Sequence, residues 1–153
     1  MAAVFKEVGE WFLSLPEEAK VVMSRAYTSA DEHECNSPAC FGGWLAVKYQ
    51  TNEYENDNGG HDMRRYYGDG ANMFAKDLGF KNKDLGFKNM DDLGRYADEN
   101  YEIWGNRSGF YMFYEPQAFD EGDKKYTRDN ITTKAIGEKL IAVAERLEKT
   151  KKV

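Results

Sequence analysis

The spacing of apolar residues predicts a mainly helical chain. The clearest segment lies near the C-terminal end, where apolar residues recur every three or four positions and lysines and glutamates occupy the other face. Thr132 precedes this segment and is a good N-cap residue. We therefore expect a helix after Thr132 that buries Ile136, Leu140, Val143, Ala144 and Leu147.

Similar patterns predict further helices along the rest of the chain. Residues 4–15 have apolar positions at helical spacing, and Pro16 ends the pattern because a residue before proline avoids the helical conformation. A second helix is expected to open at Pro16, with Ala19 among its inward residues. Shorter patterns predict helices over residues 38–49, 71–78 and 90–101. About six helices in one domain, residues 1–153, give a predicted fold class of all-α.

Two of the shorter helices carry specific expectations. Ser37 is predicted to cap the helix that starts at Pro38, which places Cys40 in its first turn. The helix over residues 71–78 is expected to turn Met73, Phe74 and Leu78 inward.

Three other stretches do not follow the helical pattern. Residues 51–70 are rich in Asn, Asp and Gly and predict a mobile loop. Residues 76–82 are repeated identically at 83–89, which indicates a duplication whose second copy is an inserted surface turn, unless both copies build packed turns. Residues 110–114 fit either a short strand or an aromatic core loop.

Charge and composition narrow the class of protein. The formal net charge of −6 argues against general binding to nucleic-acid phosphates. The N-terminal residues lack the pattern of a signal peptide, and no apolar run approaches the ~18 residues that a membrane span requires. We therefore expect a cytoplasmic protein that makes no membrane contact and keeps its two cysteines reduced.

The stretch from His33 to Gln50 holds both cysteines and is the first candidate for chemistry. Its side chains suggest a zinc site, because imidazole and thiolate are the ligands that zinc prefers, and the candidates are His33, Cys35, Cys40 and His61. Cys40 alone is a candidate nucleophile with a histidine as base. A disulfide between Cys35 and Cys40, or a purely structural role for both as small buried groups, are the other interpretations.

The second candidate is the aromatic stretch, residues 101–114. Aromatic faces next to an arginine suit a protein hot spot or a nucleotide-like ligand. The alternative is that these rings form the core, with some tyrosine hydroxyl groups exposed. The predicted binding residues are Tyr101, Trp104, Asn106, Arg107, Tyr111 and Tyr114.

The cysteine block, Cys35-Asn-Ser-Pro-Ala-Cys40-Phe-Gly-Gly-Trp44, resembles a motif of small uncharacterised bacterial and phage proteins. There a Cys-Gly-Thr/Ser-x-x-Cys-x-Ala-Gly-Trp block opens a helix; here Asn36 and Gly42 depart from the pattern. The resemblance implies a phage-type accessory protein that binds and modulates a host protein in the host cytoplasm without catalysis or a cofactor. Two alternatives stay open: a zinc- or thiol-dependent enzyme, and sequestration of a nucleotide-like molecule by the aromatic stretch.

Overall fold

The computed structural model describes a set of segments that together are mainly helical. These contain no strand, and an isolated β-bridge joins Glu121 and Lys124, so the predicted all-α class is confirmed. In this part of the chain no helix is both long and apolar enough to cross a membrane. The described residues are 1–17, 19, 21, 40–49, 70, 73–74, 76–78, 97–106 and 115–150.

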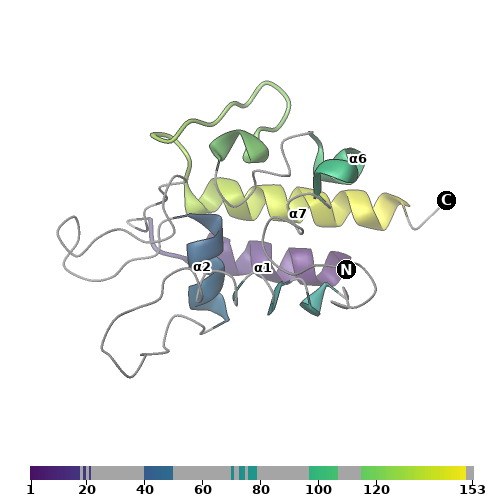
Figure 1. The fold of residues 1–153 in the computed structure, drawn as a ribbon, viewed down its shortest axis with the longest axis horizontal. Coiled ribbons are helices and arrows are strands. Elements are labelled where there is room, and N and C mark those ends of the chain that lie inside the picture. Colours follow the sequence, from purple (N-terminus) through teal and green to yellow (C-terminus); the bar gives the residue numbers. More distant parts are fainter. Residues whose placement is uncertain are drawn as a thin grey trace.

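Two long helices form the centre of the fold. Helix α1 (Ala2–Ser14) and helix α7 (Thr133–Thr150) run side by side in opposite directions (Figure 1). They meet at two glycines: a Cβ atom on Gly137 would lie 2.7 Å from the carbonyl oxygen of Gly9, and a Cβ on Gly9 would lie 2.8 Å from that of Gly137. Because neither residue has a side chain, the two backbones approach more closely than any other residue pair allows.

Helix α7 begins where the sequence predicts. The backbone N–H of Ala135 donates to Thr132 Oγ1 at 3.1 Å, which is the N-cap bond. The predicted inward residues Ile136, Leu140, Val143, Ala144 and Leu147 are all buried. One residue departs from the prediction that lysines line the solvent face, because Lys139 is buried too.

Helix α1 also agrees with its prediction, but the segment after it does not. Leu15 is extended before Pro16, with φ −69° and ψ 148°. The backbone N–H of Ala19 donates to Pro16 O at 2.9 Å, so a turn follows the proline. Glu17, Ala19 and Val21 are not helical, and the prediction that a helix opens at Pro16 is wrong at these residues. The rest of that predicted helix lies outside the described residues.

Helix α2 (Phe41–Lys48) starts three residues later than predicted. Its N-cap is Cys40, whose extended backbone (φ −97°, ψ 178°) places it before the first turn and not in it. The start is set by Phe41, which is fully buried among aromatic rings of other elements. Its ring centroid lies 5.6 Å from those of Phe12 and Phe119 and 6.0 Å from that of Phe74.

Two short helices lie along the edge of α7 that faces away from α1 (Figure 1). They are α6 (Tyr101–Trp104) and the 3₁₀ helix η3 (Pro116–Phe119), and both contact α7. Their buried side chains include Trp104 and Phe119, whose ring centroids are 6.0 Å apart. Residues 97–99 are also helical, within the predicted 90–101 helix.

Two further predictions are wrong for described residues between 70 and 78. Gly70 is helical, although the predicted loop included it. Phe74 and Leu78 are buried as expected, but Met73 is 40% exposed. Adjacent residues on a helix point about 100° apart, so Met73 and Phe74 do not face the same core. The rest of the predicted 51–70 loop, the repeat at 83–89 and the ambiguous stretch 110–114 lie outside the described residues.

Candidate functional site

The cysteine block contributes little to a site in the described part of the chain. Cys40 is only 1% exposed, so an external substrate does not reach its sulfur in this conformation. Its burial at the start of α2 agrees with the structural interpretation of this cysteine. Within the described ranges, no three His, Cys, Asp or Glu side chains lie close enough to hold a metal ion. The other predicted ligands, His33, Cys35 and His61, lie outside these ranges.

Of the predicted binding residues, the structure describes three. Tyr101 is 38% exposed on α6. Trp104 is 2% exposed, so its ring belongs to the core and not to an exposed binding surface. Asn106 is hydrogen-bonded within the protein, as described next. Arg107, Tyr111 and Tyr114 lie outside the described residues.

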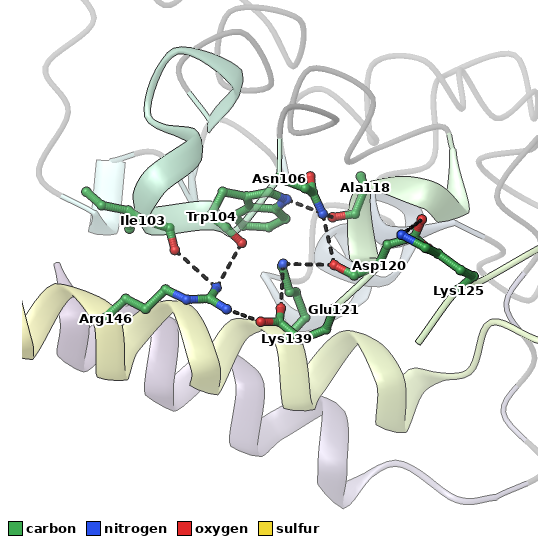
Figure 2. Close-up of polar contacts among 9 residues, drawn as sticks. All are labelled: Ile103, Trp104, Asn106, Ala118, Asp120, Glu121, Lys125, Lys139 and Arg146. Carbon is green, nitrogen blue, oxygen red and sulfur yellow. Dashed lines mark hydrogen bonds and ion pairs between the residues drawn. The ribbon is translucent and has the colours of Figure 1, made fainter. Parts of the chain in front are cut away.

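Hydrogen bonds join the two segments that flank residues 107–114. The indole Nε1–H of Trp104 donates to Ala118 O at 2.7 Å, within the core. The Asn106 side-chain Nδ2 donates to the same carbonyl at 3.2 Å and to Asp120 O at 2.9 Å. Figure 2 shows these bonds directed from the end of α6 onto the end of η3. Residues 103–106 and 118–121 are therefore fixed to each other although 11 residues separate them in sequence.

Arg146 fixes both segments to α7. Its Nη1 donates to Ile103 O at 3.3 Å and Trp104 O at 3.0 Å, the last carbonyls of α6, and its Nη2 donates to Glu121 Oε1 (Figure 2). Gly105 makes room for the guanidinium: its φ is +98°, and a Cβ there would lie 2.6 Å from Nη1. Position 105 therefore favours glycine for its backbone angle, and a Cβ there would displace the guanidinium from this position.

Lys139 is the second cation of the cluster. Its side chain is 1% exposed, and Nζ lies 2.7 Å from Glu121 Oε2 and 3.3 Å from Asp120 O. The ammonium also lies 5.5 Å from the centroid of the Trp104 ring, whose face attracts a cation. Burial lowers the pKa of Lys139 to about 8, and the negative charge of Asp120 opposes this shift.

The turn after η3 presents the carboxylate that both cations share. Glu121 and Lys124 pair through their backbones, with N···O distances of 3.0 and 2.9 Å, and Gly122 between them has a φ of +57°. The neighbouring Asp120 carboxylate accepts a bond from the backbone N–H of Tyr126 at 2.8 Å, which orders the exit from the turn. We call Trp104, Asn106, Glu121, Lys139 and Arg146 the anchor cluster.

Two hollows lie elsewhere in the described structure. An apolar cavity of about 20 Å³ adjoins Trp104, Phe5 and Val143 and has room for little more than a water molecule. An open groove of about 480 Å³ lies where α1 ends and α7 begins, with Leu13 and Lys134 on its walls. The cavity is lined by one predicted binding residue, Trp104, and the groove by none.

The sequence pattern missed Glu121, Lys139 and Arg146. The sequence does contain a signal for Lys139 and Arg146. Lys139 falls three residues after Ile136 and four before Val143, so it interrupts the apolar face of the helix, and Arg146 follows two turns later on the same side. A charged residue at an apolar position indicates a buried partner. No local pattern indicated that Glu121 is that partner.

Comparison of the chain with protein-family models, with curated proteins and with solved structures gave no match. The resemblance of the cysteine block therefore stays a prediction. In the described residues, the anchor cluster is a connected set of buried and partly buried polar contacts that joins separate segments.

Proposed function

We propose that this protein acts by binding another protein, and that the aromatic stretch, residues 101–114, makes the contact. The observation that carries the proposal is that the anchor cluster fixes residues 103–106, inside this stretch, to residues 118–121, which follow it. A binding segment whose ends are fixed before contact loses less conformational entropy on binding. Recognition surfaces also commonly carry their contact residues on segments that a rigid scaffold holds in place.

The chemistry of the stretch supports a protein partner. Tyr101 is substantially exposed beside the cluster, and tyrosine and arginine are enriched at the centres of protein interfaces. The sequence from 107 to 114 adds an arginine and five further aromatic or methionine residues. If the resemblance to phage-type proteins holds, the partner is a host protein and its modulation is the biological role.

A nucleotide-like ligand is supported less well by the same residues. Stacking on a base requires an open aromatic face. The Trp104 ring is buried, with Lys139 over it and Phe119 against it. Of the described aromatic residues in the stretch, Tyr101 has the exposed ring.

The test is affinity capture from host lysate with three forms of the full-length protein. The forms are the wild type, a variant with alanine at positions 101, 107, 111 and 114, and Leu13→Ser as a control at an exposed apolar residue in the groove. We expect the wild type and the control to retain one defined protein and the fourfold variant to lose it.

The captured protein is then purified and its dissociation constant is measured for each form. A loss of at least about tenfold in affinity for the fourfold variant alone would support the proposal. Equal affinity of all three forms would contradict it, and loss in Leu13→Ser alone would place the contact in the groove. Circular dichroism of each variant checks that the helical content is unchanged.

A further inference from the structure

The charges in the anchor cluster do not balance. Lys139 and Arg146 share the single carboxylate of Glu121, one on each oxygen. The Asp120 carboxylate is turned toward the Tyr126 backbone and Lys125, whose Nζ lies 3.9 Å away. With both cations protonated, the contacting groups carry two positive charges and one negative charge, and the lysine side chain is removed from water.

Only one member of the cluster can relieve this excess. A guanidinium keeps its proton at any ordinary pH, and Glu121 is stabilised as a carboxylate by its two cationic partners. Lys139 can lose a proton and keep both of its bonds, because a neutral amine still has two N–H donors for Glu121 and for the Asp120 carbonyl. The Trp104 ring on its remaining side attracts the ammonium through its face but carries no full charge, so it opposes the loss only weakly.

We propose that the anchor cluster is a proton-linked lock: Lys139 releases a proton when the turn at residues 120–121 closes onto α7 and takes up a proton when that turn opens. Mild alkalinity therefore tightens the contact, and a return to neutral pH loosens it. The lock would regulate how firmly residues 103–106 and 118–121, on either side of residues 107–114, are held for binding. This biological use rests on the proposed function, whereas the lock itself is tested on the free protein.

The direction follows from proton linkage. Burial lowers the pKa of Lys139 to about 8, whereas the ordinary lysine value is 10.5. Between these values the open state binds more protons than the closed state, so stability rises with pH across this window. Below pH 8 the lysine is charged in both states, and the full cost of burying the ammonium remains.

The first experiment compares chemical unfolding of the wild type with that of Lys139→Met and Lys139→Arg between pH 7 and pH 10. Neither replacement can titrate in this range, so each serves as a reference for all the other groups. The ratio of the wild-type to the variant unfolding constant should fall about 50-fold over this range. A ratio that stays constant, or that rises with pH, would overturn the lock, because the pairing with Glu121 would then dominate.

The second experiment does not require a folded Lys139→Met variant. Lysine side-chain signals of the wild-type protein are followed by NMR through the same range, and the Lys139 signal is assigned by its absence in Lys139→Arg. We expect its midpoint at about 8. A midpoint at or above the ordinary value of 10.5 would refute the proposal. Neither experiment involves a binding partner, so the lock and the proposed function can fail separately.

Discussion

The contact between α1 and α7 and the anchor cluster hold the same long helix in different ways. The α1–α7 contact is apolar. Each helix has a regular apolar face, and Gly9 and Gly137 let the two backbones touch. The second is polar and joins α7 to two segments by single side-chain contacts. The helix pair joins two regular apolar faces, whereas the cluster fixes the position of two short segments that each place an aromatic ring, Trp104 or Phe119, in the core.

The helix pair should be the more sensitive region. In Gly137→Val the new side chain would start 2.7 Å from the Gly9 carbonyl oxygen and 2.9 Å from Leu13 Cγ, so the helices must separate. We expect a loss of about 3 kcal/mol or more in the free energy of unfolding, measured with denaturant. A matched change, Gly122→Asn, has open space around it and should lower stability by less than about 1 kcal/mol. Similar losses in both variants would contradict the close contact.

A substitution at Gly105 tests the fit between α6 and Arg146. Gly105→Ala combines a φ of +98° with a Cβ placed 2.6 Å from the guanidinium. We expect a loss of about 2–3 kcal/mol in the free energy of unfolding. Gly122→Ala is the control, because it has a positive φ of +57° but no neighbour within 4 Å, and it should lose about 1 kcal/mol. The difference between the two reports the less favourable φ of Gly105 together with the contact to Arg146.

Removing the Arg146 charge should weaken the cluster while the helix pair persists. Arg146→Met loses the bonds to Ile103 O and Trp104 O and leaves Glu121 with one cation. We expect the free energy of unfolding to fall by about 2 kcal/mol. Amide hydrogen exchange should become faster in residues 103–106 and stay unchanged in α1. The control Arg128→Met alters an exposed pair with Glu115 at 4.0 Å and should change stability by less than about 0.5 kcal/mol.

The smallest effect is expected for an ion pair outside the cluster. Lys48 Nζ lies 3.2 Å from Glu7 Oε1 and links α2 to α1, but the Glu7 side chain is largely exposed. Glu7→Gln should therefore lower the free energy of unfolding, measured with denaturant, by no more than about 0.5 kcal/mol. A loss as large as that of Arg146→Met would mean that burial does not distinguish the two sets of charges.

The sequence predicted each helix of the α1–α7 pair well because the signals for a helix are local, but it did not predict their contact. Apolar spacing and the Thr132 cap suffice to place α7, and Pro16 marks the end of α1. The start of α2 was misplaced because Ser37 and Pro38 form a plausible cap, whereas the burial of Phe41 against three distant rings makes Cys40 the N-cap.

The candidate site was less predictable for the same reason. Aromatic composition drew attention to residues 101–114, but burial of Trp104 depends on the Ala118 carbonyl, and no sequence period encodes that contact. Lys139 was assigned to the solvent face because lysine usually lies there. Its true environment depends on a turn 18 residues earlier.

The contacts described above make the two segments and α7 one energetic unit at the anchor cluster. The most direct test is a double-mutant cycle of Asn106→Ala and Arg146→Met, measured by chemical unfolding at pH 7. These side chains bind different partners, yet both fix residues 103–106 to residues 118–121. We expect a coupling energy of about 1 kcal/mol or more between the two substitutions. Additive effects, within about 0.3 kcal/mol, would contradict it.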